Sequence, residues 1–546
     1  MTSFALRRAL PSLSALVVLL VGIGFVGVAF AGLPPWAPIA FALVFVLLQY
    51  AITPWVIERL VPAQPILHDG TTYDTEHPLG AIVARRCADA GVKLVTLGVI
   101  DDGNPNAFTF GHHRGDARVW VSTGLLERLD EKQLDAVISH EIAHVKNNDV
   151  LLMTAAAAVP LAIYAAYLAI RATPRDEVRR FAFVAYLGYL ASQLCVLALS
   201  RARESTADHW SCEITGDGEA LASALVKIAY GMGEVRADQS QQVATLRAQG
   251  KAGRRAADKL QRQHQRIGAI GVLGISDPRQ AGATSTIMQA GLDEQTVRGA
   301  MGWEIHNPWG RVLEKLSSHP LTARRIDDLA RSGLPGAPHG WGDVTSTTAD
   351  TAVAGARRAF FSDLVIMLAP YVAVGAAFGL FGTTSRLDVG LAVLVAGVLF
   401  LYKQVVRYPT TFEPVDRVTS LLTRIDASPM RGIPVSVVGT IIGRGMPGYR
   451  LSADLVVQDE SGFLTLLYRQ PLPLWGALFA LFKADRFKGQ QVLIRGWYRR
   501  GPGPYLELKD VVAGSGARTR CWEWVVRYAG AVVVLMVGLG IVLSAL

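Results

Sequence analysis

Residues 134–149 read LDAVISHEIAHVKNND. Residues 140–144 within it match the pattern H-E-x-x-H. On a helix, residues four apart share a face, so His140 and His144 can bind one metal ion. Glu141 then lies where its carboxylate can take a proton from a water molecule at the metal. A pattern with only three fixed positions also arises by chance, so the surrounding sequence must decide.

The composition indicates a membrane protein with more than one domain. The chain has 546 residues, of which 51% are hydrophobic and only 18% are charged, and its formal net charge is +9. In a membrane protein such a positive excess usually marks cytoplasmic loops, so it does not by itself point to nucleic acid. The four cysteines match no ligand spacing and give no reason to propose disulfides or a cysteine-bound metal.

Several apolar runs are long enough to cross a bilayer. The first, Leu13–Ala31, is predicted to be a signal anchor, with a cleaved signal peptide as the alternative because residues 29–31 resemble a cleavage site. The run Trp36–Ile57 then returns the chain to the cytoplasm, so residues 1–58 hold two spans. Further spans are predicted as a hairpin over residues 150–200, a pair over residues 359–403 and a last span over residues 524–546. The total is six or seven.

The stretches 59–149 and 201–345 are predicted to form two parts of one catalytic domain with a small β-sheet. Strands are expected at Lys93–Ile100, Asn106–Gly111 and Arg118–Val121, where β-branched residues are frequent. Asp130 is the expected N-cap of the helix that carries the motif, because Gln133 follows three residues later.

From residue 408 to residue 520 the pattern changes to short strands separated by glycine-rich turns. Their order resembles a small five-stranded barrel of the OB type. The expected strands are Ile433–Ile442, Ala453–Asp459, Phe463–Tyr468, Gln491–Tyr498 and Tyr505–Val512. Between the third and fourth lies Leu472–Phe482, an apolar segment too short to cross a bilayer, which is predicted to be an interfacial helix.

A catalytic zinc needs a third protein ligand, and the candidate is Glu204 in the stretch SRARESTAD at residues 200–208. We assume that the motif helix continues into the apolar run after Val150 and that the chain turns near Pro174. His144 then lies 30 residues before the turn and Glu204 lies 30 residues after it. Both would be about 45 Å from the turn, so two antiparallel helices would bring Glu204 level with the histidines.

Two neighbours of Glu204 have other expected roles. His209 lies about 140° further round the helix than Glu204 and is not expected to bind the same metal. Asp208 lies one turn after Glu204 and has two open interpretations. It either orients a metal-binding histidine, or it forms a helix salt bridge with Arg201 or Arg203.

The two motifs, in this order and with a hydrophobic hairpin between them, resemble the integral-membrane zinc metallopeptidases that include HtpX and the type I CAAX prenyl proteases. The resemblance covers residues 35–335 and includes P-N-A-F at residues 105–108 and S-H-P at residues 318–320. It implies one zinc ion held by His140, His144 and Glu204, with Glu141 as the general base. The barrel at residues 408–520 and the last three spans depart from the usual HtpX pattern.

The weaker motifs suggest further roles through the same resemblance. Asn106, Ala107 and Phe108 would lie on an edge strand that binds the substrate main chain, and His319 would stabilise the tetrahedral intermediate. The alternatives are a turn residue for Asn106 and a helix-start residue for His319. His112 and His113 follow the edge strand and are interpreted as exposed loop residues.

The predicted fold is a mainly α, multi-pass membrane protein with a zincin-like catalytic domain and a C-terminal OB-like barrel. The implied function is that of a zinc metalloendopeptidase that cleaves membrane or membrane-associated proteins at the cytoplasmic face of the cell membrane, in protein quality control. One alternative is a CAAX-type processing protease with few substrates. Another is a membrane scaffold or receptor whose barrel binds a partner. Nucleic acid is not expected, because no set of aromatic side chains is clearly placed on one face of the barrel.

Overall fold

The structure, a computed structural model, describes residues 36–66, 77–172, 181–230, 253, 294–341, 350–381, 385–444, 452–501 and 503–546. The chain divides into two compact units. The first comprises Met1–Gly282 with Val312–Asp343, and the second comprises Ala283–Arg311 with Val344–Leu546. The predicted first span, Leu13–Ala31, lies outside the described residues.

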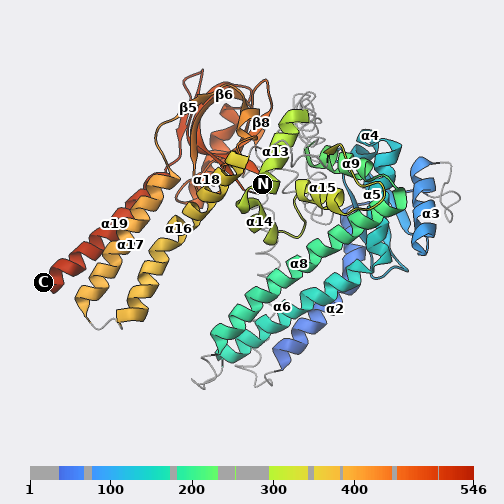
Figure 1. Cartoon of the computed structure of the whole chain (residues 1–546), viewed down its shortest axis with the longest axis horizontal. Helices are drawn as coiled ribbons and strands as arrows, with labels where there is room; N and C mark the ends of the chain where they lie inside the picture. The colour runs from blue at the N-terminus through green and yellow to red at the C-terminus, as the bar shows by residue number, and fades with distance from the viewer. Residues whose placement is uncertain are drawn as a thin grey trace. The chain divides into compact units, whose positions relative to one another are not determined.

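Six helices in the described part of the chain are long and apolar enough to cross a membrane. They are α2 (Ala37–Leu60), α6 (Asp149–Ala172), α8 (Ala182–Thr215), α16 (Asp350–Phe381), α17 (Arg386–Arg407) and α19 (Glu523–Ala545). Within the first unit α2, α6 and α8 run side by side, and within the second α17 packs between α16 and α19 (Figure 1). The predicted spans from residue 36 onward are therefore confirmed as apolar helices.

A four-stranded sheet in the first unit has the order β1–β2–β4–β3. Its strands are β1 (Gln64–Pro65), β2 (Thr96–Ile100), β3 (Ala107–Phe110) and β4 (Arg118–Ser122). Strands β2 and β4 are parallel, and β3 pairs antiparallel with β4 at the edge of the sheet. The three strands predicted in this region are confirmed, and β3 is an edge strand as expected.

The register of β3 decides which main-chain groups face its open side. Ser122 N donates to Asn106 O, and the next residues pair in sequence, with Ala107 opposite Val121. In an antiparallel pair the bonding direction alternates from residue to residue. Asn106 and Phe108 therefore bond toward β4, whereas the N–H and C=O groups of Ala107 and Thr109 point to the open edge.

The two faces of β3 pack against different helices. Phe108 and Phe110 join a buried core with Trp120 and the last turns of α2, and the rings of Phe110 and Trp120 meet edge to face at 4.7 Å. Burying an aromatic side chain of this kind contributes about 1.5–3 kcal/mol. Thr109 lies on the other face and contacts α5 (Glu131–Lys146). The sheet is thus held between the end of a membrane helix and the helix that carries the motif.

Helix α5 begins with the predicted cap, since Asp130 and Gln133 form a reciprocal capping box. It ends at Lys146, and α6 begins at Asp149. The expectation of one continuous helix is therefore wrong. Asn148 has a φ of +53°, a conformation that asparagine tolerates better than most residues, and its Oδ1 accepts a hydrogen bond from Arg114 N at 2.9 Å.

Helix α8 is continuous from the apolar hairpin into the folded part of the first unit. Its buried polar residues Ser200, Glu204, Asp208 and Ser211 recur every three to four positions, so they share one face. Ser211 Oγ donates to the carbonyl of Ala136 in α5 at 2.7 Å. This face of α8 therefore packs against the motif helix, as the third-ligand argument requires.

The second unit contains a closed five-stranded barrel, which confirms the predicted strands. Its strands are β6 (Ile433–Arg444), β7 (Leu455–Gln458), β8 (Phe463–Leu467), β9 (Gln491–Arg500) and β10 (Pro504–Ala513). They pair around the barrel as β6–β7–β8–β10–β9–β6, with β8 and β10 parallel and the other pairs antiparallel. Two unexpected short strands, β5 (Glu413–Val415) and β11 (Arg518–Arg520), extend the sheet, and α18 (Pro473–Phe482) connects β8 to β9.

Helix α13 (Glu294–His306) belongs to the second unit, although its sequence falls within residues 201–345. Trp303 Nε1 donates to the carbonyl of Ala427 at 2.8 Å. The buried guanidinium of Arg500 donates to Ala300 O at 2.8 Å and to Leu422 O at 2.6 Å, and it lies 4.7 Å from the centre of the Trp303 ring. Helix α14 (Pro308–Lys315) follows α13 in the chain.

Candidate metal centre

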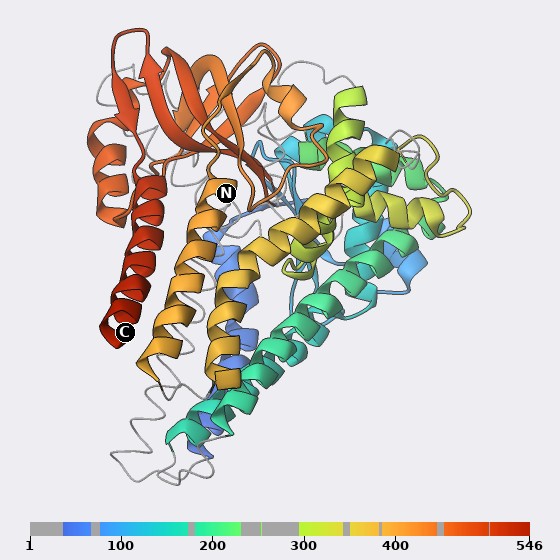
Figure 2. The same ribbon diagram turned by 60° about the vertical axis from the view of Figure 1, so that its left-hand side comes forward.

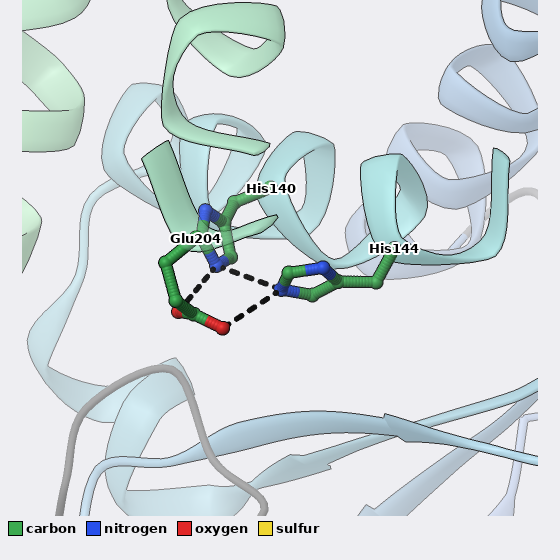
Figure 3. Close-up of side chains that lie close together, drawn as sticks. All are labelled: His140, His144 and Glu204. Carbon is green, nitrogen blue, oxygen red and sulfur yellow. Dashed lines mark hydrogen bonds and ion pairs between the residues drawn. The ribbon is translucent and has the colours of Figure 1, made fainter. Parts of the chain in front are cut away.

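His140 and His144 on α5 and Glu204 on α8 form a buried cluster (Figure 3). The two Nε2 atoms lie 3.2 Å apart, and the Glu204 carboxylate oxygens each lie 3.6 Å from one of them. Ligands at about 2.0–2.1 Å from a tetrahedral zinc ion are themselves about 3.3 Å apart. The spacing of these atoms therefore fits a zinc site.

The Glu204 carboxylate gives a second reason to place a cation here. Its Oε2 atom is buried and, within the described part of the chain, has no hydrogen-bond partner, although His319 Nδ1 lies 3.1 Å away. A buried carboxylate oxygen without a donor is costly. A metal ion between the three side chains would satisfy it.

Two aspartates lie behind the histidines. Asp208 Oδ1 is 2.8 Å from His140 Nδ1, and Asp149 Oδ2 is 2.6 Å from His144 Nδ1. A carboxylate on Nδ1 fixes the orientation of the ring and leaves Nε2 free to bind a metal. Asp149 was missed in the sequence, because its position depends on the break between α5 and α6.

Asp208 contacts His140, as one of its two interpretations expects, and it also makes an ion pair with an arginine other than the two expected. Its carboxylate accepts two hydrogen bonds from the buried Arg325 of α15 (Thr322–Arg331), at 2.6 and 2.8 Å. The salt bridge expected with Arg201 or Arg203 is wrong, since Arg203 instead pairs with Glu204 at 2.6 Å. Arg201 donates to the carbonyls of Glu314, Lys315 and Ser317.

The charge around His140 has a direct consequence for metal binding. Burial lowers the pKa of His140, but the hydrogen bond and negative charge of Asp208, together with Glu204, raise it to about 9. A histidine must be neutral to bind a metal, so loading this site releases a proton. Metal affinity should therefore weaken as the pH falls.

Glu141, the residue after the first histidine, is 2% exposed, and its carboxylate accepts a hydrogen bond from the β-sheet. Thr109 Oγ1 donates to Glu141 Oε2 at 2.7 Å. Thr109 was not identified in the sequence as a site residue. The alternation of β3 could have pointed to it, because Phe108 and Phe110 flank it and face the opposite side of the sheet.

His319 lies at the same cluster, between α14 and α15. It is buried, and its main-chain N–H donates to Ser317 Oγ at 3.3 Å. Because Arg201 of α8 binds the carbonyl of Ser317 at 2.9 Å, the loop that carries His319 is tied to the helix that carries Glu204. The structure thus brings His319 to the third ligand.

The three residues predicted to bind substrate lie at the start of the edge strand, but they differ in whether their main-chain groups are free to bind another strand. The main-chain groups of Asn106 are both taken by Ser122, at 2.8 and 2.9 Å. Phe108 is buried in the core behind the sheet. Ala107 keeps its main chain on the open edge, together with Thr109.

The remaining histidines of this region lie outside the cluster. His209 pairs with Asp328 at 3.1 Å, as expected for a residue on another side of α8. His113 is exposed, but the interpretation of His112 as a simple loop residue is wrong. Its Nδ1 lies 2.6 Å from Asp116 Oδ2, and its Nε2 lies 3.1 Å from the carbonyl of Ala51 in α2.

Comparison with known proteins identifies relatives of this chain. The family model described as Peptidase family M48 matches residues 75–332. A protease HtpX homolog of Methanothermobacter thermautotrophicus is 36% identical over 202 residues, which are 37% of this chain and 75% of that protein. A protease HtpX homolog of Ralstonia nicotianae is 42% identical over 146 residues, 26% of this chain and 51% of that protein.

A third relative and one solved structure extend the comparison. The protease HtpX homolog of Burkholderia thailandensis is 37% identical over 187 residues, covering 33% of this chain and 64% of that protein. The crystal structure of Ste24p from S. mikatae is 17% identical, with a TM-score of 0.29, and the match covers 40% of this chain and 55% of that one. The family model describes a peptidase family, and the three relatives are named as proteases.

Proposed function

Because the chain belongs to peptidase family M48, whose members are metalloproteases, we propose that it is a zinc endopeptidase acting on membrane or membrane-associated proteins. The buried cluster of His140, His144 and Glu204 carries the proposal, since its spacing and its unsatisfied carboxylate oxygen fit one zinc ion. The apolar helices of a multi-pass membrane protein flank this cluster in the chain, which supports substrates in or near the bilayer.

The proposed reaction follows from the side chains around the cluster. When bound, zinc supplies Lewis acidity, which polarises a peptide carbonyl and acidifies a water molecule. Glu141 takes the proton of that water and later passes it to the leaving amine. His319 donates to the oxygen that becomes negative during attack, a contribution typically worth about 100- to 1000-fold in rate. Asp208 and Asp149 hold the two imidazoles in place.

The open edge of β3 is the proposed binding place for the substrate main chain. Ala107 and Thr109 present their N–H and C=O groups there, and Thr109 also contacts Glu141. A strand added at this edge would pair by main-chain hydrogen bonds. Such pairing depends little on the side chains of the substrate. It therefore suits broad specificity and a role in protein quality control.

We place the proposed site at the cytoplasmic face of the cell membrane. Glu204 follows Ser200, where the apolar part of α8 ends, and the histidines precede α6 by only a few residues. This closeness of the cluster to the ends of two apolar helices supports a site at the membrane surface. For the second unit we propose an OB-like fold with a role in regulation or protein interaction, supported by the closed five-stranded order with its parallel β8–β10 pair.

Two variants test the proposed chemistry in the full chain reconstituted in nanodiscs. Glu141→Gln should keep one zinc ion, measured by elemental analysis, yet lower cleavage of an unfolded protein substrate by about 100-fold or more, because the proton acceptor is lost. Glu204→Ala should lose the zinc itself. Normal cleavage by Glu141→Gln would exclude it as the base, and full zinc occupancy in Glu204→Ala would refute the ligand set.

The same inactive variant separates the alternative functions. Capture of many bound membrane proteins by Glu141→Gln in native membranes would favour quality control. Capture of only a few defined proteins would favour a CAAX-type processing enzyme. A scaffold or receptor would keep its partners and its cellular effect even when cleavage is lost.

A further inference from the structure

Helix α18 presents an apolar surface on the outside of the barrel. Six large hydrophobic side chains of this short helix and its cap are exposed, which is more than isolated surface residues would explain. We call this group, with the basic residues that follow it, the α18 surface. Its apolar members are Leu472, Leu474, Trp475, Leu478, Leu481 and Phe482.

The helix is firmly attached to the barrel on its other side. The buried ring of Phe479 stacks on Tyr468 with 3.9 Å between centroids, and it also contacts Phe487. Ala480 is buried beside it. The exposed side chains are therefore not left outside because the helix packs badly. The helix has a buried face and an apolar outer face, so something other than water is expected to cover the outer face.

Hydrogen bonds tie the start of α18 to the start of a membrane helix. Gln470 Nε2 donates to the carbonyl of Arg520 at 2.8 Å, and Gln470 Oε1 accepts from Trp522 N at 3.3 Å. Trp522 is the N-cap of α19. Figure 2 shows α18, in orange, beside the upper end of α19, in red. The apolar surface thus begins at the level where α19 approaches the bilayer.

The segment of residues 483–488 that follows α18 holds three basic residues and one acidic residue, Asp485, which pairs with Arg444 at 2.9 Å. Lys483, Arg486 and Lys488 are all exposed within a few residues of the apolar face. Basic side chains beside an apolar helix face suit a leaflet with anionic headgroups, where each contributes about 1 kcal/mol. The exposed Trp475 and Trp522 suit the boundary between headgroups and acyl chains.

From these observations we propose that the α18 surface inserts into the leaflet from which α19 departs, and that it binds anionic lipid through Lys483, Arg486 and Lys488. The barrel is then docked on the bilayer by a contact additional to its membrane helices. The proposal does not depend on proteolysis, since every residue that carries it lies in the second unit. The proposal concerns the outer surface of the barrel, where α18 would contact lipid.

A spin label on the helix tests the insertion in the full chain. A Cys195→Ser background is used because the other three cysteines are buried. Labels are placed at Leu478→Cys and, as the matched control, at Leu493→Cys on barrel strand β9, since the two leucines are 43% and 44% exposed. Collision with oxygen, which dissolves in the bilayer, is compared with collision with a water-soluble nickel chelate in nanodiscs containing phosphatidylglycerol.

The label at position 478 should show a several-fold higher oxygen-to-nickel ratio than the label at position 493. That difference should shrink in nanodiscs of neutral lipid and in the variant K483Q/R486Q/K488Q. A ratio equal to that of the control would overturn the proposal. Protection of position 478 from both reagents would also overturn it, because a second copy or another protein would then cover the helix.

Discussion

Thr109 links two parts of the proposed reaction through one residue. Its main chain faces the open edge of β3, and its hydroxyl donates to the carboxylate of Glu141. Binding of a substrate strand at this edge would therefore act on the same residue that holds the base. The hydroxyl is expected to fix which way the Glu141 carboxylate points.

Replacing Thr109 with valine tests this connection. Valine keeps the shape and strand preference of threonine but removes the donor. A hydrogen bond to a charged group contributes about 1.5–3 kcal/mol, so kcat should fall about 10- to 100-fold while KM stays close to its normal value. Peptide cleavage measures both constants, and zinc content should not change.

Thr109→Ser is the matched control, because it restores the hydroxyl and should recover most of kcat. An unchanged kcat in Thr109→Val would show that the hydrogen bond has no catalytic role. A rise in KM alone would instead assign Thr109 to substrate binding.

At this scale the sequence pointed to the residues of the cluster better than to the residues that contact them. The spacing of four residues was enough to place His140 and His144 on one face of a helix. The argument for Glu204 assumed a continuous helix that the break at Asn148 contradicts, although α6 and α8 pack together as it required. The partners Asp149, Thr109 and Arg325 come from a helix junction, an edge strand and a distant helix. Their roles depend on tertiary packing, which spacing along the chain does not reveal.

At the junction between α5 and α6 the structure differs most from the prediction, which was one continuous helix. Asn148 adopts a left-handed backbone conformation there, and Asp149 begins the next helix directly against His144. Asn147 and Asn148 are compatible with a helix end, but asparagines also occur inside helices, so the helix pattern alone did not predict this break. The break nevertheless decides where the Asp149 carboxylate lies.

Changing the conformation of residue 148 should therefore affect zinc binding. Asn148→Val places a β-branched residue at positive φ, which costs about 1–3 kcal/mol and should displace Asp149 from His144. We expect a lower melting temperature and about 10-fold weaker zinc binding in competition with a chromophoric chelator. Asn148→Gly tolerates this φ and should stay close to the unmodified protein. Equal zinc affinity in both variants would contradict the argument.

A second element, the β3–β4 loop, contacts α2 through the side chain of His112. The protonated ring can donate to the Asp116 carboxylate and to the Ala51 carbonyl at the same time, whereas the neutral ring has only one N–H. The hydrogen bond and the negative charge of Asp116 raise the pKa of His112, although burial lowers it. In the unfolded chain the pKa of histidine is about 6.5.

This contact should make stability depend on pH with a defined sign. Because folding raises the pKa of His112, its contribution is complete below the unfolded value and is lost as the pH rises through the raised value. The melting temperature of the unmodified protein should exceed that of His112→Gln most at about pH 6, and the gap should narrow toward about pH 9. His113→Gln, at the exposed neighbour, should show no such trend. A gap that widens with pH would contradict the assignment.

At the scale of the whole chain, the notable feature is that the second unit takes in a helix from the middle of the sequence. Helix α13 forms hydrogen bonds with Arg500 of β9 and with the carbonyl of Ala427. Arg500 lies 200 residues after its partner Ala300. Composition and motifs could predict the six apolar helices and the barrel strands. They could not assign α13, because nothing local distinguishes a helix that packs on one unit from a helix that packs on the other.

Loss of the buried arginine should release α13. Arg500→Met leaves the carbonyls of Ala300 and Leu422 without their donor, which should cost about 3 kcal/mol or more, since both hydrogen bonds come from a charged group. Limited proteolysis should then cut within residues 294–306. Arg424→Met is the matched control, because its pair with Asp426 is exposed on both sides and should contribute at most about 1 kcal/mol. Equal resistance of both variants to proteolysis would refute the role of Arg500.

The position of α13 also sets an order of events during translation. The ribosome makes Trp303 more than a hundred residues before it makes Ala427, and Arg500 follows later still. Domains generally fold as they emerge, starting from the N-terminus. Here the stretch between Glu204 and His319 contains a helix whose packing partners do not yet exist when the three residues of the metal cluster have already been made. A nascent chain stopped before the barrel therefore carries all three residues of the metal cluster, but α13 cannot reach its final packing until Arg500 at the end of β9 has left the ribosome.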